Sequence, residues 1–257
     1  MSYIDAAILG ILQGLTEFFP ISSSGHLVLV QSLLGVKVAG VSFELLVHLG
    51  SLAAVLIYFR VRIVELVRAV FDRTMVPQRK VIAFLVIGTI PAGVVGVLLD
   101  DFFERAFSNP TMTSYMLLVT GLILLSTRFV RSREGEVTLT GSIVMGLGQA
   151  LAIFPGISRS GSTIAAGMLC GIKPTEAAEF SFLLAVPAIG GAVVLKAGDL
   201  AEIGSELMGP YLAGVLLSFI FSLAAVHLLL KIVRRGRFQY FAYYCFAAGL
   251  VGLYLFS

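Results

Sequence analysis

The chain has 257 residues, of which 58% are hydrophobic and 13% are charged. A soluble domain carries about 25% charged residues, so this chain lacks the polar surface of a soluble protein and is predicted to lie in a lipid bilayer. The formal net charge is +3, and no basic stretch is interleaved with aromatic residues, which excludes a nucleic-acid-binding protein.

Six apolar segments each approach the roughly 20 residues that a membrane-spanning helix needs. The first five residues carry no basic charge, and Gln13 and Glu17 interrupt the apolar run that follows, so we expect no cleaved signal peptide. The sequence therefore predicts an all-α polytopic membrane protein. The expected spans are residues 41–59, 81–99, 111–127, 177–195, 209–230 and 239–256.

Two pairs of shorter apolar segments are interrupted by residues that do not continue a helix. Residues 3–19 and 27–35 are separated by Pro20 and the sequence SSSGH, and residues 142–154 and 164–171 are separated by PGISRSGST. This pattern is typical of re-entrant helix–loop–helix hairpins, because irregular backbone at membrane depth is tolerated only inside protein or along a wet cavity.

The two interrupted regions also match each other. Residues 13–27 (QGLTEFFPISSSGHL) align without gaps with residues 149–163 (QALAIFPGISRSGST). The alignment predicts one transmembrane domain built from two repeat halves, about 1–135 and 136–257. Each half has one hairpin, which returns to its own side, and three spans, which do not. The second half is therefore expected to have inverted topology, as in many transporters.

The basic residues fall mainly on one side of this layout. Lys37, Arg105 and Lys196 fall on the other side, and Arg159 lies in the second loop. The basic side is predicted to be cytoplasmic, which places both termini outside and lets the two loops meet near the middle of the membrane. Residues 60–70 are expected to form a short interfacial helix. The fourteen residues on the basic side are Arg60, Arg62, Arg68, Arg73, Arg79, Lys80, Arg128, Arg131, Arg133, Lys173, Lys231, Arg234, Arg235 and Arg237.

The first hairpin carries ionisable side chains that are costly at membrane depth, and Glu17 and His26 are therefore functional candidates. Gln13 lies four residues before Glu17, on the same face of a helix. His26 is a natural general acid or base near neutral pH, and Glu17 suits the orientation of a histidine or the binding of a divalent cation. A serine beside a base is a candidate nucleophile. The polar residues of this loop are Ser22, Ser23, Ser24, Gly25 and His26.

The second hairpin carries donors for an anion. The guanidinium of Arg159 suits phosphate oxygens, and Gly- and Ser-rich turns before a helix present N–H groups to an anion. Serines alone also serve helix packing, but both clusters recur at the same repeat position, which favours one shared phosphate site. Glu44 and His48, four residues apart at the start of the span 41–59, are candidates to contact the residues of this phosphate site from outside the two loops. The second loop contains Ser158, Arg159, Ser160, Gly161, Ser162 and Thr163.

At these same residues the chain resembles the undecaprenyl-diphosphate phosphatases of the bacitracin-resistance type. That family has an acidic residue or Gln four residues before a Glu, then a Ser-rich loop ending in Gly-His, and later a Pro-Gly-x-Ser-Arg-Ser-x-x-Thr motif. Here these are Gln13 to Glu17, the sequence SSSGH at 22–26, and PGISRSGST at 155–163. The resemblance covers essentially the whole chain. Gln13 stands where many relatives have Glu, which leaves one fewer carboxylate for a metal.

The resemblance implies hydrolysis of undecaprenyl diphosphate to undecaprenyl phosphate and inorganic phosphate at the outer face of the bacterial plasma membrane, with a divalent cation (Mg²⁺ or Ca²⁺) and bacitracin tolerance. It implies metal or base chemistry for Glu17, acid–base chemistry for His26, Ser23 as the candidate nucleophile and Arg159 as a clamp for the diphosphate. A covalent bond to His26 and direct attack by water remain open alternatives to Ser23. Ser22, Ser24, Ser158, Ser160 and Thr163 would donate to phosphate. A lipid-phosphate flippase or secondary transporter and a membrane scaffold remain open alternatives. A homodimer is also open.

Overall fold

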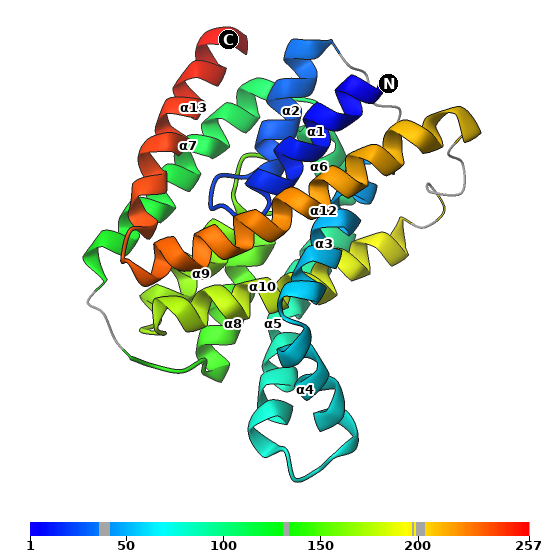
Figure 1. The fold of residues 1–257 in the computed structure, drawn as a ribbon. Coiled ribbons are helices and arrows are strands. Elements are labelled where there is room, and N and C mark those ends of the chain that lie inside the picture. The colour runs from blue at the N-terminus through cyan, green and yellow to red at the C-terminus, as the bar shows by residue number, and fades with distance from the viewer. Residues whose placement is uncertain (36–41, 131–133, 197, 199–203, 257) are drawn as a thin grey trace.

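The structure is a computed structural model that describes residues 1–35, 42–130, 134–196, 198 and 204–256 (Figure 1). Three basic residues used in the topology argument, Lys37, Arg131 and Arg133, lie outside the described residues. The helices are α1 (Tyr3–Thr16), α2 (Ser23–Leu34), α3 (Ser42–Tyr58), α4 (Arg60–Phe71), α5 (Val76–Leu98), α6 (Asp100–Phe107), α7 (Pro110–Ser126), α8 (Leu139–Leu151), α9 (Arg159–Leu169), α10 (Pro174–Leu195), α12 (Ser205–Arg234) and α13 (Phe241–Phe256).

Five helical segments in the described residues are long and apolar enough to cross a membrane: α5, α7 with its following turn, α10, α12, and α13 with its preceding turn. The remaining predicted span, residues 41–59, corresponds to α3, which has 17 residues. It passes the same test only together with α4, from which it is bent by 81°. No β-strand occurs in the described part of the chain. The prediction of an all-α polytopic membrane protein is confirmed.

The two hairpins are present, but their second helices begin earlier than predicted. α2 begins at Ser23 instead of residue 27, and α9 begins at Arg159 instead of residue 164. The cause is N-terminal capping: the hydroxyl of Ser22 accepts from the Gly25 N–H at 3.2 Å, and that of Ser158 accepts from Gly161 at 3.0 Å. The Ser-rich motifs are therefore first helical turns and not loops.

Each hairpin packs by its first helix against a long helix of the other half. α1 lies on α12, where a Cβ added to Gly10 would come within 2.3 Å of the Gly214 carbonyl oxygen. α8 lies on α5 in the same way, with Gly146 and the Gly88 oxygen also 2.3 Å apart by that measure. Small residues permit this close approach of helix backbones. The first hairpin thus packs on a helix of the second half, and the second hairpin packs on a helix of the first half, as expected for two related halves. The boundary between the halves near residue 135 stays a prediction.

The ends of the molecule are distinct. The N- and C-termini lie at one end, and α4 lies at the opposite end beside the start of α5 (Figure 1). The short helix predicted at residues 60–70 is present as α4. The short helix α6 was not predicted, because its sequence, DDFFERAF, reads as a polar connection between two spans.

We expect Gly156→Ala to destabilise the fold by about 2 kcal/mol or more. Gly156 has a φ of 96°, and an added Cβ would lie 2.3 Å from the backbone oxygen of Thr113. Thermal unfolding of the purified protein in detergent measures the effect. The control is Gly190→Ala, because nothing lies within 4 Å of a Cβ there. Equal melting temperatures for the two variants would contradict the prediction.

Candidate active site

The two hairpin loops meet at their tips, as predicted. The hydroxyl of Ser22 accepts hydrogen bonds from the backbone N–H groups of Gly25 in its own hairpin and Gly156 in the other, both at 3.2 Å. A Cβ on Gly25 would lie 2.9 Å from the Gly156 Cα. Ser22 adopts a left-handed φ of 68°, which is unusual for a residue other than glycine. The serine thus links both loops from a strained backbone.

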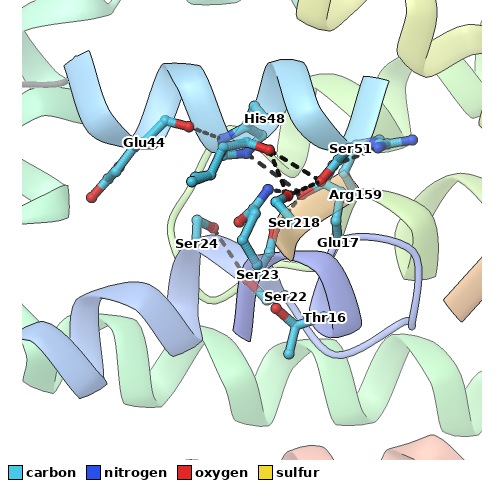
Figure 2. A network of polar contacts seen from close by, with 12 residues as sticks. Thr16, Glu17, Ser22, Ser23, Ser24, Glu44, His48, Ser51, Arg159 and Ser218 are labelled. Atoms are coloured by element: carbon cyan, nitrogen blue, oxygen red, sulfur yellow. Dashed lines mark hydrogen bonds and ion pairs between the residues drawn. The ribbon is translucent and has the colours of Figure 1, made fainter. Parts of the chain in front are cut away.

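Glu17 is the centre of the polar network shown in Figure 2. Arg159 donates from Nη2 to Oε1 of Glu17 at 2.6 Å, which joins the second hairpin to the first. Gln13 donates from Nε2 to Oε2 at 3.0 Å, and the Ser23 hydroxyl donates to the same oxygen at 2.5 Å. His48 Nε2 lies 3.5 Å from Oε2. Because Glu17 is only 7% exposed, these contacts offset the cost of burying its charge.

His48 reaches this carboxylate from α3. Its Nδ1–H donates to the Glu44 carbonyl oxygen at 2.7 Å, one helical turn earlier. A carbonyl oxygen only accepts, so the ring presents Nε2 to Glu17. The carboxylate of Glu44 instead accepts from Gln31 Nε2 at 3.2 Å and points away from Glu17 in Figure 2. Of the two α3 candidates, His48 contacts the centre through its side chain and Glu44 supports it through its backbone.

His26 lies apart from Glu17 and has a different partner. Its Nδ1–H donates to the Ser22 carbonyl oxygen at 2.7 Å, and its Nε2 pairs with the Tyr244 hydroxyl at 2.8 Å. The two rings stack with centroids 5.6 Å apart. Among the described residues, no hydrogen bond or ion pair joins Glu17 to His26, so the structure does not show the orienting carboxylate that the sequence suggested. Tyr244 was missed because it lies within an apolar span, where only its polar hydroxyl was a signal.

The predicted phosphate donors of the second hairpin mostly bond to protein. The Ser160 hydroxyl donates to the Phe19 carbonyl at 3.1 Å. Thr163 bonds to the backbone of its own helix and to the Ser181 hydroxyl at 2.6 Å. Ser158 caps α9, whereas the buried Ser162 hydroxyl has no hydrogen-bond partner in the part of the chain that the structure describes. In the first hairpin, Ser24 pairs with Ser22 at 3.3 Å.

A cluster of buried hydroxyls lies between α1, α3 and α12. Ser51 contacts Ser218 and Ser222 at 3.0 Å each. Ser218 also donates to the Val47 carbonyl, and Ser222 to that of Gly14. These hydroxyls link α3, which carries His48, to α12 and to α1, which ends directly before Glu17. No local pattern in the sequence indicates this cluster, because Ser218 and Ser222 lie on a span far along the chain from Ser51.

Two features bear on a metal ion. Among the described residues, no group of three or more His, Cys, Asp or Glu is placed to hold one. The side-chain oxygen of Gln13 is buried and has no hydrogen-bond partner among the described residues, so it is available as a ligand beside Glu17. Mg²⁺ typically keeps several waters and takes one or two carboxylates plus substrate phosphates. The residues fit that mode and not an all-protein cage.

Comparison with known proteins gives the family. Residues 6–251 match the family described as bacitracin resistance protein BacA. The chain belongs to this family. It is 42% identical over 266 residues to "Undecaprenyl-diphosphatase 1" of Shouchella clausii (strain KSM-K16), covering 98% of this chain and 95% of that protein. It is 39% identical to "Undecaprenyl-diphosphatase" of Salinibacter ruber (strain DSM 13855 / M31), with coverage of 99% and 100%. The protein of that name from Syntrophotalea carbinolica (strain DSM 2380 / NBRC 103641 / GraBd1) is 41% identical, with 97% of each chain covered.

We expect Arg159→Met to lower the free energy of unfolding by about 3–5 kcal/mol, because it leaves the buried Glu17 carboxylate without its cation. Adding Glu17→Gln should restore part of this loss, since the uncompensated charge is then removed. Thermal unfolding in detergent measures both variants. Arg128→Met, at an exposed arginine, is the control and should change stability by about 0.5 kcal/mol or less. A double variant as unstable as the sum of its single variants would contradict a coupled pair.

Proposed function

We propose that the protein hydrolyses undecaprenyl diphosphate to undecaprenyl phosphate and inorganic phosphate. The observation that carries the proposal is the buried Glu17–Arg159 pair, which joins the two hairpins beside the Ser23 hydroxyl. A base, a hydroxyl and a guanidinium at one point suit phosphoryl transfer. Their position among membrane-spanning helices suits a substrate with a lipid tail. The relatives are named as diphosphatases, which favours hydrolysis over transport.

The short contact between Ser23 and Glu17 suggests the first chemical step. Glu17 takes the Ser23 proton while the serine oxygen bonds to the terminal phosphorus. The bond from that phosphorus to the bridging oxygen breaks, and undecaprenyl phosphate leaves. Water then attacks the phosphoserine, which releases inorganic phosphate and regenerates the hydroxyl. Arg159, whose other terminal nitrogen bonds to the Ser181 carbonyl at 3.3 Å, neutralises the phosphate oxygens during both steps.

His26 is proposed as the acid–base group for the leaving phosphate. Its Nδ1–H is held by the Ser22 carbonyl and its Nε2 by the Tyr244 hydroxyl. This arrangement fixes the ring plane and keeps Nε2 in a hydrogen bond through which a proton can move. Because Ser22 also bonds to the second hairpin, His26 is positioned relative to both loops.

A divalent cation, Mg²⁺ or Ca²⁺, is part of the proposal. Glu17 and the free side-chain oxygen of Gln13 would hold it, with further ligands from the diphosphate and water. Such an ion would supply positive charge for the phosphate oxygens.

We also propose an orientation in the bacterial plasma membrane, in which this recycling of carrier lipid would serve peptidoglycan synthesis. The basic end would face the cytoplasm, both termini would face outward, and the active site would open to the extracytoplasmic side. The placement of the termini at one end and α4 at the other supports this orientation (Figure 1). The homodimer stays an untested prediction.

The purified protein in detergent is expected to release inorganic phosphate from undecaprenyl diphosphate when Mg²⁺ or Ca²⁺ is present. Glu17→Ala, His26→Ala and Arg159→Ala should each lower kcat/KM by about 100-fold or more, the usual effect of losing an acid–base group or a charge-stabilising donor. A colorimetric phosphate assay on folded variants measures this.

Arg128→Ala is the matched control for the loss of an arginine and should keep full activity. No phosphate release by the unaltered protein with any cation would overturn the phosphatase proposal. Phosphate release that persists after a chelator has removed divalent cations would overturn the proposed cation requirement but not the phosphatase activity.

We expect His48 to position the Glu17 carboxylate. His48→Ala should lower kcat by about tenfold with little change in KM, because it acts on the base and not on substrate binding. His48→Gln should retain most activity, since an amide can still donate to Glu17 Oε2. Steady-state kinetics, with melting temperatures recorded in parallel, test this. Equal losses in both variants would rule out a positioning contact.

A further inference from the structure

A cavity of about 440 Å³ lies outside the active site, beside the C-terminal ends of α3 and α12. Tyr58 comes from the end of α3, and every other lining residue comes from the end of α12 or directly follows it. Its polar walls include a hydrogen bond between the Tyr58 hydroxyl and His227 Nδ1 at 3.4 Å. The cavity is lined by Tyr58, His227, Leu230, Lys231, Arg234 and Arg235.

Three of these residues are cations that lack an acidic partner among the described residues. Arg234 and Arg235 lie three and four positions after Lys231, at the end of α12 and directly after it, where like charges repel. None of the ion pairs in the described residues includes them. The C-terminal end of a helix offsets roughly half an elementary charge, which is far less than three. The side chains of all three are exposed, so the cluster is accessible to an anion from outside the described part of the chain.

Neighbouring acidic residues do not supply that anion. A second, smaller cavity on the other side of Tyr58 is lined by Arg62, Glu65 and Glu179 among others. Arg62 lies 3.3 Å from the Glu65 carboxylate and 3.4 Å from that of Glu179. Both carboxylates thus share the single cation of Arg62, and neither forms an ion pair with Lys231, Arg234 or Arg235 in the described part of the chain. Among the described residues, the three cations of the first cavity are thus left without an acidic partner.

The surroundings of the cavity are apolar and exposed. Ile57, next to Tyr58, is 48% exposed, and Leu228, next to His227, is 45% exposed. In a membrane protein such side chains face lipid acyl chains. A charged cavity at the end of two membrane helices, beside lipid-facing side chains, matches the shape of a phospholipid: a headgroup for the cations and acyl chains for the apolar surface.

We propose that this cavity binds the phosphate headgroup of an anionic phospholipid. The two guanidinium groups supply planar donors for phosphate oxygens, Lys231 adds a point charge, and the Tyr58 hydroxyl adds a further donor. Binding to the folded protein stabilises the junction between α3 and α12. This site is separate from the Glu17–Arg159 centre and does not depend on the proposed hydrolysis.

The test compares phosphatidylglycerol with phosphatidylcholine of the same acyl chains, each added to the full chain in detergent micelles. Native mass spectrometry measures bound lipid, and thermal unfolding measures stabilisation. We expect about tenfold more phosphatidylglycerol than phosphatidylcholine to be retained. The variant Lys231→Gln/Arg234→Gln/Arg235→Gln should lose this preference and the stabilisation. Arg234→Gln alone should show a smaller loss and serves if the triple variant fails to fold.

The control variant removes the same charge from exposed arginines that do not line the cavity: Arg68→Gln/Arg73→Gln/Arg128→Gln. It should keep the lipid preference. Equal losses in both triple variants would mean diffuse surface charge and overturn the site. Stabilisation of the unaltered protein by millimolar inorganic phosphate to the same extent as by phosphatidylglycerol would overturn a lipid site in favour of a free anion. Equal retention of both lipids by the unaltered protein would also overturn it.

Discussion

The ion pair between Glu17 and Arg159 is the constraint on which the rest of the structure depends. A buried carboxylate is stable only with charge compensation, and its partner comes from a residue 142 positions away. The two hairpins, which are far apart in the sequence, must therefore meet at their tips inside the protein. Ser22 secures the same meeting through backbone N–H groups of both hairpins. Fold and site are thus stabilised by the same contacts.

The sequence repeat explains why two similar hairpins form the site, and the residues that differ between the two hairpins explain its chemistry. Ser23 in the first hairpin corresponds to Arg159 in the second, and Glu17 corresponds to Ile153. The duplicated backbone places the two motifs in comparable positions, while only one of them carries the acid. Gln13 accordingly bonds to a carboxylate, whereas the side-chain amide of the equivalent Gln149 is buried and has no hydrogen-bond partner within the described residues. One hairpin supplies the base and the other supplies the cation.

Much of this was predictable from the sequence, and the failures have two different causes. Hydropathy and Pro- and Ser-rich interruptions located the spans and hairpins, because the bilayer demands long apolar helices. The starts of α2 and α9 were placed late because the capping hydroxyls of Ser22 and Ser158 allow polar residues to begin a helix. Tyr244 was missed because its contact with His26 spans 218 positions. Local patterns such as apolar runs can be recognised in a single sequence, whereas contacts between distant spans cannot.

The two histidines show how helix backbone replaces side chains in this site. Soluble enzymes often orient a histidine through a carboxylate, but a further buried charge is costly in a membrane. His26 and His48 each donate from Nδ1 to a carbonyl oxygen four residues earlier, at 2.7 Å. A neutral group that the helix already contains thereby sets each ring, and both Nε2 atoms are left for Tyr244 and Glu17. The site therefore needs one buried carboxylate where an arrangement oriented by acids would need three.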